Sequence, residues 1–129
     1  MSIGKRAFTG AMGPVDLSGC PALHSIGYGA FLSADGTVNL RGCTGLTRIE
    51  DMAFVSASAV SLLDCPQLAM IGSYAFFHAK GTLNLSQCTK LKEIGDGAFA
   101  SIKRSDVEFA TPTPEIQTAM LNSPAFERT

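Results

Sequence analysis

The stretch that decides the fold is IGYGAFLSADGTVNLRGCTGLTR, residues 26–48. It begins with I-x-x-x-A-F, passes through a glycine to the alternation V-x-L, and ends in C-x-x-L. The same string starts again at Ile49, 23 residues after Ile26. An internal repeat has to be recognised before local secondary structure is considered, because its period determines the whole architecture.

The repeat recurs along most of the chain. Three intact units are 23 residues long and one is 22, and a divergent fifth unit follows. The shorter unit lacks a residue between Phe54 and Val60, where its neighbours have a glycine, so we expect the deletion to fall in a connecting loop. The units begin at Ile3, Ile26, Ile49, Ile71 and Ile94.

The repeated apolar positions form columns that we expect to be the core. One column is Phe preceded by Ala, two more are the V-x-L pair, and a Cys column and a Leu column follow. Their members are Phe8, Phe31, Phe54, Phe76 and Phe99; Val15, Val38, Val60, Leu83 and Val107; Leu17, Leu40, Leu62, Leu85 and Phe109; Cys20, Cys43, Cys65 and Cys88; Leu23, Leu46, Leu68 and Leu91.

A unit this short cannot bury its apolar face alone, whereas stacked units bury a continuous strip, so the period predicts a solenoid. The V-x-L pair has the two-residue period of a strand and suits one rung of a parallel sheet. The C-x-x-L-x-x-I spacing fits a return built from turns or 3₁₀ helix. We expect the I-G-x-x-A-F string to form at most one helical turn.

Two strings resemble a known family. V-x-L-x-x-C-x-x-L is similar to the conserved segment of leucine-rich repeats, with one extra residue before the last apolar position. I-G-x-x-A-F resembles the BspA-like class of those repeats, although in that class the Cys follows Ala-Phe and not the strand. The resemblance covers about residues 3 to 110 and implies an α/β, right-handed solenoid. About five short parallel strands would line one face, with turns, 3₁₀ or very short helices on the other.

The resemblance also implies a use. Such solenoids mainly bind other proteins through the concave sheet, and many BspA-like members are adhesive surface proteins. A cell-surface or secreted location would follow from it. The first residues, MSIGKRAFTG, show no secretory signal, so either the protein stays inside a cell or the sequence begins after an export signal.

The repeat predicts two regions. Residues 1–110 form the solenoid, with about 4.5 repeats, and residues 111–129 form a C-terminal cap and tail. Thr113-Pro114-Glu115 has the features of a helix start, and an apolar stripe follows it. We therefore expect a short cap helix from about 114 to 122; a disordered tail is the alternative. At the other end the first unit has no polar cap, so another copy of the chain or an upstream segment should cover it.

The composition argues against nucleic acid and against the membrane interior as partners. The net charge is −1 and Lys and Arg are evenly spread, which gives no support for nucleic acid. No apolar run reaches the roughly 18 residues that a membrane-spanning helix needs, so we expect no membrane insertion.

The single cysteine of each unit has several interpretations. Cys43 occupies the column filled by Asn or Cys in leucine-rich repeats, and a buried, inert thiol is the favoured one. A disulfide between neighbouring coils is the alternative, since coils about 5 Å apart are within its range. A linear ladder of thiols cannot surround a zinc ion, so we expect no metal site.

The residues do not assemble an enzyme. His24 and His78 fall in different columns, the acidic residues are scattered, and the glycine pairs lack a phosphate-binding continuation. The sequon Asn84-Leu85-Ser86 is of a kind that arises often by chance. We expect no catalytic residue and no cofactor.

The strand positions that alternate with the core must face outward and form the candidate protein-binding face. This face is small and polar, with Arg41 and Leu63 as its large side chains. We expect a protein-interaction module; the alternative is a structural block that stacks end to end or dimerises through its first unit. The candidate residues are Asp16, Thr37, Asn39, Arg41, Ser61, Leu63, Thr82, Asn84, Ser86, Asp106 and Glu108.

Overall fold

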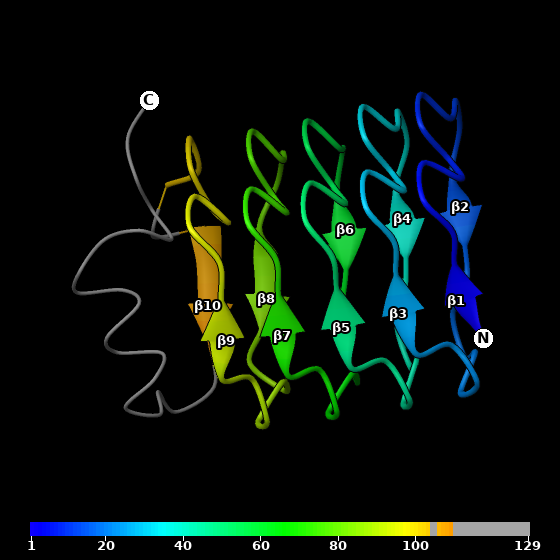
Figure 1. The fold of residues 1–129 in the computed structure, drawn as a ribbon, viewed down its shortest axis with the longest axis vertical. Helices are drawn as coiled ribbons and strands as arrows, with labels where there is room; N and C mark the ends of the chain where they lie inside the picture. Colours follow the sequence, from blue (N-terminus) through cyan, green and yellow to red (C-terminus); the bar gives the residue numbers. More distant parts are fainter. Residues whose placement is uncertain (104–105, 110–129) are drawn as a thin grey trace.

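The computed structural model describes residues 1–103 and 106–109, and these residues form a parallel β-solenoid (Figure 1). Each repeat is one turn of the solenoid, here called a coil: residues 3–25, 26–48, 49–70 and 71–93 are the first to fourth coils, and the fifth starts at residue 94. Nearly every backbone contact between elements joins one coil to the next. The predicted solenoid is therefore confirmed, and the predicted cap helix lies outside the described residues.

Each coil contributes one strand to each of two sides of the solenoid. The Ile columns form a five-stranded parallel sheet in the order β1-β3-β5-β7-β9. The V-x-L columns form a three-stranded sheet, β2-β4-β6, and a two-stranded one, β10-β8. The strands are β1 (Ser2–Ile3), β2 (Val15–Asp16), β3 (Ser25–Ile26), β4 (Val38–Asn39), β5 (Arg48–Ile49), β6 (Val60–Ser61), β7 (Met70–Ile71), β8 (Leu83–Leu85), β9 (Glu93–Ile94) and β10 (Val107–Phe109).

The Ile sheet was not predicted from the sequence, which indicated strands only at V-x-L. Its strands are two residues long, too short for an alternation to stand out. Ile is β-branched and prefers extended backbone, and a closed coil needs an extended segment on each side. The Ala-Phe string that follows forms turns, and the described residues contain no α-helix.

Two left-handed residues bracket each Ala-Phe pair. In the third coil Met52 has φ 61° and Ser56 has φ 56°, and the corresponding positions of the other coils also have positive φ. Most of these positions are not glycine, although a side chain makes this backbone unfavourable. The N–H groups of these residues in the first four coils donate to carbonyls of the next coil, as Met52 does to Ser73 O and Ser56 to Phe77 O, which supports this conformation.

The columns stack in register through the centre. From the second coil onward the Phe, Leu and Cys columns are buried, and the Phe rings form a continuous stack with centroid separations of 5.0 to 5.8 Å. In the first coil Ile3, Phe8, Leu17 and Cys20 are only half-buried, whereas Leu23 is fully buried. The core therefore runs along the solenoid axis and is open at the first coil.

The shorter third coil interrupts one side. Its missing residue falls in the loop before β6, as expected, and Val38 still pairs with Val60 in register. β6 and β8 lie side by side without forming a ladder. A cavity of about 10 Å³ lies at this interruption, lined by Val60, Phe76, Ala79, Lys80, Gly81, Thr82, Leu83 and Ile102.

Candidate functional site

The predicted binding face contains two rows of polar side chains in register. Asp16 pairs with Asn39 and Asn39 with Ser61 across β2, β4 and β6. Across β8 and β10, Asn84 pairs with Glu108. The residues that alternate with them, such as Val38, Val60 and Leu83, are apolar and pack in the core, which is why the polar ones face outward.

The remaining predicted residues flank these rows. The residues of the whole face differ in exposure, both on the strands and on the adjoining turns. Asp16, Thr37, Arg41, Thr82, Ser86 and Glu108 are exposed, while Asn39, Ser61, Leu63, Asn84 and Asp106 are half-buried. The face is thus divided by the interruption between β6 and β8.

Three members of the rows fix the turn that follows their strand. Asn39 Oδ1 accepts a hydrogen bond from the N–H of Arg41 at 3.0 Å. Asp16 and Asn84 accept the same bond from Ser18 and Ser86, at 3.0 and 2.9 Å. Hydrogen bonds from the Ser18 hydroxyl and N–H also lower the pKa of Asp16. The polar rows are therefore held in place before any partner binds.

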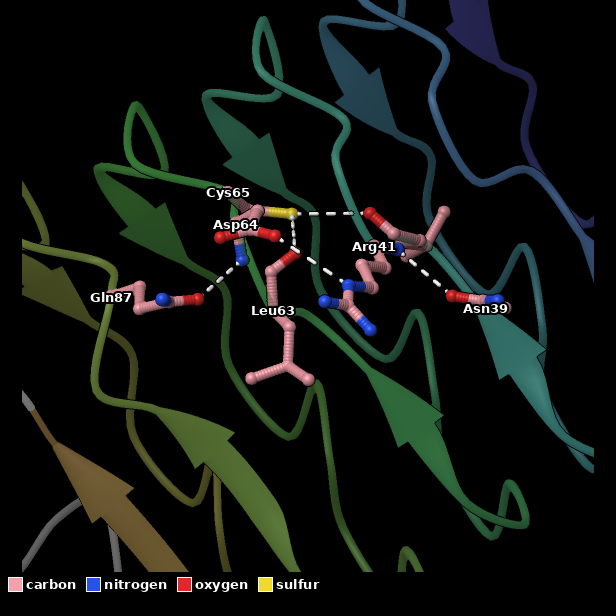
Figure 2. A network of polar contacts seen from close by, with 7 residues as sticks. Asn39, Arg41, Leu63, Asp64, Cys65 and Gln87 are labelled. Atoms are coloured by element: carbon pink, nitrogen blue, oxygen red, sulfur yellow. Dashed lines mark hydrogen bonds and ion pairs between the residues drawn. The ribbon is translucent and has the colours of Figure 1, made fainter.

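Arg41 is tied to the next coil (Figure 2). Its Nε lies 3.5 Å from Asp64 Oδ2, and both side chains are more than half exposed, at 63% and 51%. The N–H of Asp64 donates in turn to Gln87 Oε1 at 2.7 Å. Leu63 precedes Asp64 on the same turn (Figure 2). These contacts place the two large residues of the face, one cationic and one apolar, on neighbouring coils.

The cysteine column is structural. Cys43 Sγ donates to Leu17 O and Cys65 Sγ to Leu40 O, each at 3.2 Å, so the thiols link successive coils. All four cysteines are free. Burial raises the pKa of Cys65 to about 11 and that of Cys88 to about 12, which keeps the thiols protonated and unreactive at neutral pH. Cys43 is fully buried, as that interpretation requires, and burial raises the pKa of its thiol as well.

The described residues contain no group of three or more His, Cys, Asp or Glu side chains arranged to hold a metal ion. His24 lies beside the terminal amine, with Met1 N 3.4 Å from Nδ1, whereas the His78 ring packs on Phe77 at 4.1 Å. The two histidines thus sit in separate surroundings. In the same part of the chain no helix is long and apolar enough to cross a membrane.

A second surface was not predicted from the sequence. There Tyr28, Met52 and Tyr74 stand just after the Ile strands of consecutive coils. Tyr28 and Tyr74 are 36% and 41% exposed, and the Tyr28 hydroxyl lies 3.2 Å from Met52 Sδ. Arg6 lies over the Tyr28 ring, 5.9 Å from its centroid. These residues fill the variable positions of I-x-x-x-A-F. Large side chains at those positions were the sequence signal from which this surface could have been predicted.

A parallel solenoid with 22- and 23-residue coils and a buried Phe and Cys column defines a leucine-rich-repeat architecture. The family described as "BspA type Leucine rich repeat region" matches residues 1–126 with 6 copies, and the chain belongs to this family. The predicted resemblance is confirmed. Neither a curated protein nor a solved structure matches the chain.

Proposed function

We propose that the protein is a non-enzymatic interaction module that binds another protein through the outward face of the V-x-L strands and their adjacent turns. The observation that carries this proposal is the in-register row of Asp16, Asn39 and Ser61 on rigidly stacked coils. Membership of a leucine-rich-repeat family supports it, because repeat solenoids offer extended binding surfaces.

The character of the face fits recognition better than chemistry. The described residues bury no polar or charged side chain and leave no buried side-chain nitrogen or oxygen without a hydrogen bond. Catalytic groups, by contrast, are commonly polar side chains in enclosed surroundings that perturb their pKa values. The polar groups here lie on an open surface instead, where they are free to contact a partner.

Arg41 and Leu63 form the proposed centre of the contact. The exposed ion pair between Arg41 and Asp64 contributes little to stability, so Arg41 can exchange Asp64 for an acidic group of a partner at small cost. Arginine is enriched in the residues that dominate binding energy. The adjacent Leu63 is half-buried and supplies apolar contact.

The test begins by selecting binders from a displayed protein-fragment library against the native protein. Independent binders are then measured against Arg41→Glu and Leu63→Glu, with Lys80→Glu as a control of the same charge on another turn. We expect most binders to lose about tenfold or more in affinity with the first two variants only. Equal affinity for all three variants in most binders would contradict the proposal.

End-to-end stacking through the first coil, the alternative that the sequence raised, is favoured by the half-buried apolar columns there.

A further inference from the structure

The backbone of the V-x-L strands bonds each of the first coils to the next at fixed positions. In the second coil the N–H groups of Val38 and Leu40 donate to carbonyls of the third coil, each at 2.9 Å. In the first coil the equivalent residues Val15 and Leu17 donate to the second coil at 2.9 and 2.8 Å. These bonds help to join β2, β4 and β6 into one sheet.

This bonding stops between the third and fourth coils. The equivalent donors of the third coil are the N–H groups of Val60 and Leu62, and neither donates to the matching carbonyl of the fourth coil, on Thr82 or Asn84. β6 and β8 accordingly form no ladder, although β8 pairs again with β10 of the fifth coil. The V-x-L side therefore contains an internal break, in which residues 58–63 face residues 81–86 without main-chain pairing.

The cysteine column is interrupted at the same place. The thiols of Cys43 and Cys65 each donate to a carbonyl of the preceding coil at 3.2 Å. The equivalent acceptor for Cys88 is Leu62 O, and no hydrogen bond joins these two residues of the described chain. The cavity of about 10 Å³ beside the break is lined in part by Val60 and has the size of one water molecule. The third and fourth coils are therefore less closely joined here than the coils before them.

One side chain replaces a main-chain acceptor at the end of the break. The N–H of Gly42 donates to Leu63 O at 2.9 Å, and by the same pattern its counterpart Asp64 would donate to Ser86 O. Asp64 donates instead to the carboxamide oxygen of Gln87 at 2.7 Å (Figure 2). Gln87 is exposed, so this bond can open and close by a side-chain rotation that leaves the core undisturbed.

The opposite side of the solenoid stays joined across the same two coils. β5 pairs with β7, and the Ala-Phe segment keeps its main-chain bonds, such as Phe54 N–H to Ala75 O at 2.7 Å. The rings of Phe54 and Phe76 remain stacked, with centroids 5.1 Å apart. A rotation about this joined side would change the separation of β6 and β8 while these contacts stayed in place.

We propose that the break is a hinge within the solenoid and that Gln87 is its latch. The first three coils and the coils that follow rotate relative to each other about the Ile strands and the Ala-Phe segment, so that β6 and β8 move apart and together. A continuous ladder opposes such a rotation, because opening it breaks several main-chain hydrogen bonds at once. At the break only the bond from Asp64 to Gln87 has to open.

The hinge bears on recognition, and this consequence rests on the proposed function. The break divides the candidate binding face, with residues up to Leu63 on one side and residues from Thr82 onward on the other. A partner that contacts both sides selects one hinge angle from those that the free protein samples. The hinge itself is tested without any partner, so its failure would leave the proposed function untouched, and failure of the binder experiment would leave the hinge untouched.

Two NMR measurements on the native protein test the hinge. Amide hydrogen exchange compares Val60 and Leu62 with Val38 and Leu40, which occupy the same columns one coil earlier. We expect protection factors about tenfold or more lower for Val60 and Leu62, since they lack a main-chain acceptor and meet water whenever the hinge opens. Relaxation dispersion should detect microsecond-to-millisecond motion at residues 58–64 and 81–87 and none at the equivalent residues of the second coil. Equal protection, or no such motion at the break, would overturn the proposal.

Matched variants test the latch. Gln87→Ala removes the acceptor of the Asp64 N–H and should speed amide exchange at Val60 and Leu62 about fivefold. Gln67→Ala is the control, because Gln67 also bonds across these two coils, but to the exposed ammonium of a lysine at 3.0 Å, and it should change exchange little. Both substitutions are at exposed residues, so both variants should melt like the native protein. An equal effect of the two variants on exchange at the break would overturn the assignment of Gln87 as the latch.

Discussion

The phenyl rings of Phe31 and Phe54 lie parallel, with centroids 5.2 Å apart and an angle of 1° between their planes. Both residues are fully buried, and Phe54 packs in the same way on Phe76 at 5.1 Å. Each inner ring of this stack is thus covered on both faces by its neighbours.

Replacing Phe54 with Ala should remove one ring from the middle of this stack. We expect the free energy of unfolding to fall by about 3–5 kcal/mol, because the side chain is fully buried and the coils above and below cannot close the gap. Urea denaturation measures the change. Phe8→Ala, in the half-buried first coil, is the control and should cost about half as much; equal losses would show that the stack does not carry the stability.

Gly27 tests how closely the Ile strands of successive coils approach. A Cβ at Gly27 would lie 2.7 Å from Ile3 O and 2.9 Å from the carbonyl carbon of Gly4. The third coil carries Glu50 in this column, so the backbone can yield, and we expect Gly27→Ala to destabilise by about 1–3 kcal/mol. Thermal denaturation monitored by circular dichroism gives the difference.

Gly4→Ala is the matched control for Gly27→Ala. A Cβ at Gly4 meets nothing within 4 Å, because no coil lies beneath it among the described residues. Its effect should stay within about 0.5 kcal/mol. If the two variants melted alike, close approach of the coils would not explain this glycine column.

The raised pKa of Cys65 should make stability depend on pH in alkaline solution. The thiol ionises near pH 9 in the unfolded chain and near pH 11 in the folded protein, because burial disfavours the thiolate. Its contribution is complete below pH 9 and is lost as the pH rises toward 11, since only the unfolded state releases the proton in that range.

Urea denaturation of the native protein and Cys65→Ala at pH 7 to 11 isolates this contribution, because other groups titrate in both proteins. We expect the difference in unfolding free energy between them to shrink as the pH rises above 9. A difference that is constant with pH would argue against a buried, protonated thiol.

Ser33 tests the left-handed positions around Ala-Phe. Its φ is 56° and its side chain is exposed, so a substitution there changes mainly the backbone preference. We expect Ser33→Val to destabilise by about 1–2 kcal/mol, because β-branched residues strongly disfavour this conformation, and Ser33→Gly to be close to neutral. Thr37→Val, on an exposed residue just before β4 whose φ is not positive, is the control that should change little, and thermal melts of the three variants provide the comparison.

The repeat period allowed the core to be predicted from the sequence, because apolar residues that recur every 22 or 23 positions can be buried together only by stacking in columns. Phe31, Leu40 and Cys43 are buried as their columns indicated. The Ile sheet could not be predicted from the sequence, since a two-residue strand is too short to show an alternation of apolar and polar residues. The left-handed positions were hidden because they carry residues such as Met52 and Tyr74 and not glycine.

The ion pair between Arg41 and Asp64 in the candidate site could have been predicted from the sequence. Asp64 follows Arg41 by 23 residues, and Gln87 follows Asp64 by 23, so the period alone places the three on neighbouring coils. The direction of the backbone hydrogen bonds between coils could not be predicted from the sequence, because it depends on backbone conformation. Only the observed pairing, such as Phe8 N–H to Ala30 O, reveals it.

The loop before β6 has one residue fewer than its counterparts. β5 still pairs with β7 and β6 with β4, whereas β6 forms no ladder with β8. Chain length at this point is thus uncoupled from the register that β6 keeps with β4. A foreign peptide inserted between Ser58 and Ala59, beyond the buried Ala57, would be displayed at the edge of the solenoid, which makes this loop a suitable site for presenting an epitope or an affinity tag.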